Sequence, residues 1–160
     1  MNEPDHTNVY QAAHAELLIA SYRRLTGKEL VEPAQTCAES YQALYEAPFG
    51  VVSHNTADDP IFNYANRTAQ CVFEMDWLTF LSLPSRQSAE PEHRAERAHL
   101  LERVATCGFI DDYRGVRISS TGVRFCIEDA TVWKVVDEQG VYRGQAAVFY
   151  HWRELQSPVE

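Results

Sequence analysis

The sequence predicts an α+β domain: a five-stranded antiparallel sheet with a helical cap, preceded by two N-terminal helices. Two β-rich runs come before a block of helical patterns, and three more follow it. Tight-turn residues join the last three runs, at Thr121-Gly122 and Glu138-Gln139-Gly140, which favours antiparallel hairpins. The 160 residues contain no internal repeat and no low-complexity linker, so one domain is expected, with a helical segment over 1–46 and a body over 47–155.

Two amphipathic helices are expected at the start of the chain. From about Thr7 to Leu25, apolar and aromatic residues recur at helical spacing, and Gly27 is suited to end this helix. A second helix is expected from Thr36 to Tyr45, because Glu39 lies three residues after Thr36 as in a capping box.

The body begins with the β-rich runs 47–54 and 61–65, which predict two strands separated by a turn at 58–60. Asn66 is suited to cap a helix that runs to about Glu74, and 77–81 predicts a further helical turn.

A longer helix is expected from a cap at Ser88, with Pro91 in its first turn, to about Cys107. The tail then predicts strands at 109–119, 123–136 and 142–152. These last strands leave few positions for solvated residues, which indicates that both faces of the sheet are covered; the apolar residues in question are Trp133, Val135, Ala147 and Phe149.

Composition narrows the classes of function. The net charge of -9, from 23 acidic and 14 basic residues, disfavours binding to a nucleic-acid backbone. No apolar run approaches the roughly 20 residues that cross a bilayer, and the polar N-terminus is unlike a signal peptide. The four cysteines form no CxxC pair, so reduced core cysteines are expected instead of a zinc ribbon. We therefore expect a soluble, cytoplasmic protein without nucleic-acid or membrane partners.

Several long strings carry a family resemblance: SHNTADDPIFNYANRTAQ, LPSRQSAEPEHRAER, GFIDDYRGVRISSTGVRF and GQAAVFYHW. Together they resemble a MEKHLA domain in its free-standing bacterial form, over about residues 14–152. The resemblance implies a PAS-like fold and a role in sensing small molecules or redox state. Plant members lie at the C-terminus of homeodomain–leucine zipper proteins, but these 160 residues hold no homeodomain or zipper, so a nucleic-acid-binding role does not carry over.

His54, Asn63 and Tyr64 are candidate ligand-binding residues. His54 ends the first strand shortly before Asp58-Asp59 and could serve a structural role, contact a ligand or bind a metal; these are too few ligands to define a metal site. Asn63 and Tyr64 lie at the junction that, in PAS-like folds, opens onto the pocket. An amide can orient a polar ligand, but Asn63 could equally hold the turn, and Asn66 could simply cap the helix.

Three arginines and a glutamine complete the candidate ligand-binding set: Arg86, Arg117, Arg124 and Gln145. Arg117 and Arg124 lie on apolar strands, where an unpaired buried charge is costly, so each must face water, an acidic partner or an anionic ligand. Glu128 and Asp129 are candidate internal partners. Two arginines that converge in a cavity would favour a carboxylate-bearing ligand.

Haem and flavin are considered because PAS-like domains can hold either. His54 and His99 are weak candidates for axial haem ligands. Cys71 does not lie in the Asn-Cys-Arg-Phe string of light-sensing flavin domains, so a covalent flavin photocycle is not expected. Nucleotide-binding, zinc-protease and serine-hydrolase motifs are absent from the sequence, and no catalytic residue is assigned.

These observations favour a sensor that binds a small polar or anionic molecule between sheet and cap. It would act through a protein partner or a homodimer formed by the N-terminal helices. Two alternatives stay open: a small haem- or metal-dependent enzyme or gas sensor on the same scaffold, and a pure interaction module with a filled core.

Overall fold

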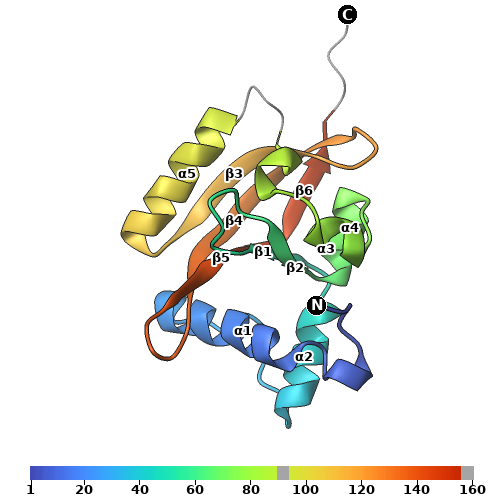
Figure 1. Ribbon diagram of the computed structural model, residues 1–160, viewed down its shortest axis with the longest axis vertical. Coiled ribbons are helices and arrows are strands. Elements are labelled where there is room, and N and C mark those ends of the chain that lie inside the picture. The colour runs from blue at the N-terminus through green and yellow to red at the C-terminus, as the bar shows by residue number, and fades with distance from the viewer. Residues whose placement is uncertain (90–93, 156–160) are drawn as a thin grey trace, which may run out of the picture.

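The computed structural model describes residues 1–89 and 94–155. It has three layers, with α1 and α2 on one face of an antiparallel sheet and α3 and α5 on the other, while α4 lies at the β2 edge and contributes Trp77 to the first core and Phe80 to the second (Figure 1). The helices are α1 Ala12–Thr26, α2 Cys37–Tyr45, α3 Arg67–Phe73, α4 Trp77–Leu81 and α5 Arg94–Cys107, with short 3-10 helices η1 His6–Asn8 and η2 Ser85–Ser88. The strands are β1 Gly50–His54, β2 Phe62–Ala65, β3 Phe109–Ile118, β4 Arg124–Val136, β5 Tyr142–Phe149 and β6 His151–Glu154.

The sheet has the strand order β2-β1-β5-β4-β3, and β6 also pairs with β4. Six strands replace the five expected because the run predicted at 142–152 is divided at Tyr150. The pairing with β4 continues in one register across this break, from Thr131↔Val148 to Glu128↔His151. Opposite the break, Asp129 adopts a left-handed φ of 51°, which interrupts β4 without ending it.

Helix α1 begins later than predicted. Val9, Tyr10 and Gln11 have φ values of 52°, 53° and 55°, a left-handed conformation that cannot continue into a right-handed helix. The predicted end is confirmed, because Gly27 has φ 73° and its N–H donates to the carbonyl of Arg23.

The predicted start of the long helix at Ser88 is wrong. Ser88 ends η2, where its Oγ donates to the carbonyl of Ser85, and Ala89 is extended. Helix α5 begins at Arg94, and Pro91 lies outside the described residues. This local hydrogen bond of Ser88 takes the place of the expected cap, and a sequence pattern does not separate the two arrangements.

Both faces of the sheet are covered, as predicted. On one face, α1 packs its apolar stripe on Trp133, whose Nε1 donates to Ser21 Oγ at 3.0 Å. On the other face, Phe73 contacts Phe80 and Phe125 edge to face, with ring centroids 5.3 and 5.0 Å apart. The helical segment 1–46 thus shares a core with the body. No helix of the described part of the chain has both the length and the apolar composition of a membrane span.

The cysteines fit the sequence expectation only in part. Cys126 is buried, whereas Cys37, Cys71 and Cys107 are exposed, and all four are free.

Asn66 ties β1, β2 and α3 together from a fully buried position. Its Oδ1 accepts from the backbone N–H of Val51 at 3.0 Å and of Ala69 at 3.1 Å. Its Nδ2 donates to the carbonyls of Leu44 at 3.0 Å and Phe49 at 2.8 Å. The predicted helix cap is confirmed, and the same side chain also anchors the end of α2 and the start of β1.

We expect Asn66→Ala to lower the free energy of unfolding by about 3 kcal/mol, because four backbone groups lose a buried partner. Asn66→Asp is also expected to destabilise, since an oxygen would then face two carbonyl oxygens. Urea denaturation measures both. Asp76→Ala is the control: Asp76 caps α4 through one exposed hydrogen bond to Thr79, and its loss should cost about 1 kcal/mol. Equal losses at the two caps would contradict the role given to Asn66.

Candidate functional site

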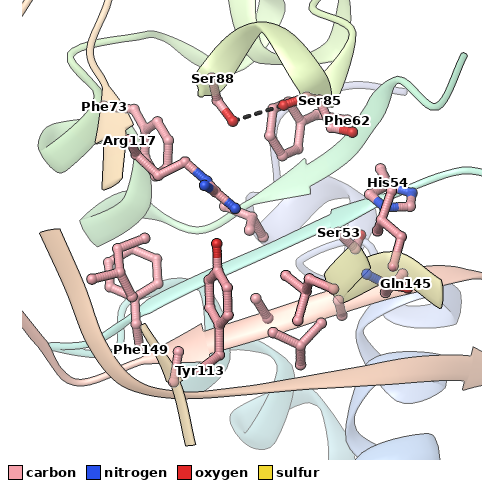
Figure 2. Close-up of a pocket in the computed structure, with 18 residues that line it drawn as sticks. Ser53, His54, Phe62, Phe73, Ser85, Ser88, Tyr113, Arg117, Gln145 and Phe149 are labelled. Atoms are coloured by element: carbon pink, nitrogen blue, oxygen red, sulfur yellow. Dashed lines mark hydrogen bonds between the residues drawn. The ribbon is translucent and has the colours of Figure 1, made fainter. Parts of the chain in front are cut away.

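A cavity of about 60 Å³ lies between the sheet and the helices α3, η2 and α5 (Figure 2). Most of its wall is apolar, from strand residues that face the cap and from Phe73 and Leu100 of the helices. The polar residues that line it are Ser53, His54, Ser85, Ser88, Tyr113, Arg117 and Gln145. Of these, Ser53 directs its Oγ to the other face of the sheet, where it contacts His14 of α1. A pocket for a drug-sized ligand has about 300 to 1,000 Å³, so this cavity as it stands holds only a few atoms.

His54 and Gln145 lie together at one end of the cavity (Figure 2). They are paired neighbours on β1 and β5, and both are buried, with 8% and 6% of their surfaces exposed. The Nδ1 of His54 is 3.0 Å from the carbonyl oxygen of Asn55. Within the described residues, the side-chain amide of Gln145 makes no hydrogen bond. This end can offer hydrogen-bonding groups to a ligand.

Arg117 and Tyr113 lie at the other end, where the guanidinium reaches toward the cavity (Figure 2). The Nη1 of Arg117 donates to the carbonyl of Val116 at 3.1 Å, and its guanidinium lies 5.5 Å from the centre of the Tyr113 ring. Among residues 1–89 and 94–155, no carboxylate pairs with Arg117. Its remaining N–H groups are therefore available to an anion.

The other two candidate arginines lie outside the cavity. Arg86 is half exposed and binds Asp59 in a bidentate pair, with Nε–Oδ1 at 3.0 Å and Nη2–Oδ2 at 3.2 Å. Arg124 begins β4 opposite Ile118 and does not line the cavity. Of the three candidate arginines, Arg117 alone lines the cavity. Glu128 pairs with Arg114 and Arg153 instead of the predicted strand arginines.

Asn63 and Tyr64 face α1, away from the cavity. The pairing shifts between Ser53↔Tyr64 and His54↔Phe62, which leaves Asn63 as an extra residue in β2. Because of this bulge, Phe62 packs under the cap while Tyr64, two residues later, packs against α1 and Trp77. Regular alternation would have placed both on one face. For this reason neither Asn63 nor Tyr64 lines the cavity.

A polar cluster that sequence reasoning missed lies on the α1 face. His14 Nε2 is 3.0 Å from Ser53 Oγ, which donates to Oδ1 of Asn63. The His14 ring stacks on Tyr64, whose hydroxyl is buried without a partner among the described residues. Burial lowers the pKa of His14 to about 4 and raises the pKa of Tyr64. The available signal was the place of His14 on the apolar stripe of the first helix.

The family model of the MEKHLA domain matches residues 12–154, nearly the whole chain. The protein belongs to the MEKHLA domain family. Its curated relatives include the homeobox-leucine zipper protein HOX32 of Oryza sativa, in both the indica and japonica subspecies. Each is 23% identical over 133 residues, which are 82% of this chain and 16% of the relative. This MEKHLA domain thus spans about one sixth of the length of those relatives.

Solved structures show that the fold is that of PAS domains. A PAS domain from Colwellia psychrerythraea matches with a TM-score of 0.61 and 12% identity, over 73% of this chain and 94% of that one. The light-state dimer of the fungal blue-light photoreceptor Vivid matches with a TM-score of 0.57 and 14% identity, over 84% and 93% of the two chains. At such identities the likeness concerns the fold alone.

The residues of this MEKHLA domain do not fit a haem or a flavin. The cavity of about 60 Å³ is far smaller than either group, and Cys71 is exposed. Of the two haem-ligand candidates, His54 faces the cavity, whereas His99 is exposed on α5. Within the described ranges, no group of three His, Cys, Asp or Glu residues is placed to hold a metal ion.

Buried His14 predicts a loss of stability in mild acid. Its pKa is about 4 in the folded protein and near 6.5 when unfolded, so between these pH values only the unfolded chain takes up the proton. The stability contribution is complete above pH 6.5, and at most about 3 kcal/mol is lost as the pH falls to 4.

Urea denaturation from pH 7.5 to 4 tests this prediction. Other groups add their own pH dependence, so the measured quantity is the difference between the wild type and His14→Gln. The exposed His151→Gln serves as the matched control. Parallel profiles of the wild type and His14→Gln would contradict the prediction.

Proposed function

We propose that this MEKHLA domain is a sensor that binds a small anionic molecule between its sheet and helical cap and signals through protein contacts. The observation that carries the proposal is the Arg117 guanidinium, which lines the cavity without a carboxylate partner among the described residues. By contrast, Arg86, Arg114 and Arg153 each lie within 4.0 Å of a carboxylate.

The net charge of the chain explains why the lack of a carboxylate beside Arg117 supports a binding role. The chain has a net charge of -9, so acidic partners for an arginine are plentiful. A cation in a mostly apolar wall, half-buried as Arg117 is, interacts more strongly with an anion than a fully exposed cation does. A ligand carboxylate or phosphate would supply the charge that the protein does not place beside Arg117.

Strand β1 supports a route from the cavity to the N-terminal helices. His54 faces the cavity, and its neighbour Ser53 contacts His14 of α1 on the opposite face. A ligand that displaces His54 would therefore act on the strand that also positions α1.

The apolar stripe of α1 is buried against the sheet, with Ala15 and Leu18 at 0% exposure. A partner that used this stripe would first have to displace α1. A homodimer or a protein partner at the N-terminal helices stays a prediction.

A second candidate is a pure interaction module. It is favoured by the size of the cavity, about 60 Å³, which approaches a filled core. This candidate requires no small-molecule ligand, and the experiment below separates the two.

The test is a thermal-shift screen with small carboxylates and phosphates, followed by calorimetry on those that bind. A ligand at 100 times its Kd stabilises by about 2.7 kcal/mol, which raises Tm by roughly 5–10 °C for a domain of this size. We expect Arg117→Gln to weaken binding at least about tenfold, because a charge-assisted hydrogen bond is lost. Arg86→Gln is the matched control and should leave binding unchanged.

Two results would overturn the proposal. The first is a wild type that no anion stabilises, which would favour the interaction module. The second is an Arg117→Gln variant that binds as well as the wild type.

A further inference from the structure

A second hollow lies on the outside of the cap, between α5 and β3. It is a groove of about 290 Å³. Charged and polar side chains from both elements line it: Glu96, His99 and Arg103 on α5, and Asp112, Arg114 and Arg117 on β3. Among the described residues that line it are three arginines and two carboxylates, and one of these arginines, Arg114, also pairs with Glu128 at 3.9 Å.

The groove and the inner cavity have a common wall. Leu100, Tyr113 and Arg117 line both of them. The side chains of these three residues separate the two hollows, and two of them, Tyr113 and Arg117, are only half-buried. Side chains of this kind change rotamer without disturbing the sheet, so the two hollows can be joined by a local movement.

Gly115 determines where Tyr113 lies. A Cβ on Gly115 would come within 2.0 Å of the Tyr113 hydroxyl, so the phenol ring lies over the glycine. The Arg117 guanidinium then covers the ring at 5.5 Å. Tyr113, Gly115 and Arg117 thus form one closed stack along β3, and an anion that draws Arg117 toward the groove would release the ring beneath it.

We propose that this groove is the entrance to the ligand site, with Leu100, Tyr113 and Arg117 as its gate. The ligand is a monocarboxylate with a short apolar chain. Its carboxylate pairs with Arg117 on the groove side, near the positive charge of Arg103, while its chain passes the gate into the inner cavity. Together the two hollows reach the size of ordinary small-molecule sites, about 300 Å³ and above. This inference rests on the proposed anion-binding function of Arg117.

The ligand class is tested with hexanoate, acetate and 1-hexanol on the full chain. Hexanoate keeps both groups, acetate lacks the chain, and hexanol lacks the charge. We expect hexanoate to bind at least about tenfold more tightly than either, since each buried methylene contributes about fourfold and the charged pair about tenfold. Acetate that binds as tightly as hexanoate would show that the chain does not enter the cavity, and would overturn the assigned class.

The gate is tested with Gly115→Ala and Tyr113→Ala. The first pushes the phenol out of its closed position, and the second removes it. Both are expected to raise the association rate of hexanoate about tenfold, measured from NMR line shapes over a ligand titration. Asp111→Asn, on an exposed position of the same strand, is the control with an unchanged rate.

The outcomes separate this inference from the proposed function. If Arg117→Gln weakens hexanoate but neither gate variant changes the association rate, the entrance is wrong and the anion site stands. If hexanoate does not bind the wild type, or Arg117→Gln binds it equally well, both fail. Circular dichroism checks that each gate variant is folded. If one of them has a folding defect, the other still tests the gate.

Discussion

The site depends on which face of the sheet each strand residue takes. Helices cover both faces of the sheet, so the side chains of each strand point alternately into the α1 core and the cap core. A shift of one residue in the pairing register therefore moves a side chain from one core to the other. Bulges in β2 and β4 are two examples of such a shift. The extra residue Asn63 sends Tyr64 to α1, and the left-handed Asp129 keeps Ile127 and Ala130 on the same cap-facing side. Together with the register shifts of β3 on both sides of Tyr113, these interruptions decide which side chains line the cavity.

Asn66 and Arg117 show two different uses of a polar side chain next to the core. Asn66 uses every hydrogen-bonding group of its amide in bonds to the backbone, and these bonds hold the start of β1 against α2 and α3. Arg117 uses one donor on its own strand and turns the rest toward a hollow. A satisfied amide fixes structure, whereas the proposed binding role of Arg117 rests on a cation beside a cavity with no paired carboxylate among the described residues.

The two faces of β1 connect these features. Neighbouring residues contact the cavity through His54 and the first helix through Ser53, so one short strand carries both the candidate sensor surface and its candidate output. On the α1 side the polar cluster of His14, Ser53 and Asn63 is partly buried beside the Tyr64 hydroxyl, which has no partner among the described residues. A cluster of this kind is sensitive to small displacements, because hydrogen bonds weaken steeply with changes in geometry.

Local patterns were enough to predict the class of fold, the family, the order of the elements and several of their ends, such as Gly27 after α1 and the Asn66 cap of α3. His54, Arg117 and Gln145, which the sequence offered as candidate ligand-binding residues, all lie around the cavity. Tertiary structure alone decided the rest: the bulges that moved Asn63 and Tyr64, the Asp59 partner of Arg86, and the closeness of Arg117 to the cavity and the groove at once. Periodicity is a property of neighbours along the chain, whereas bulges, ion pairs and hollows arise from contacts between segments that fold together, and no spacing in the sequence records them.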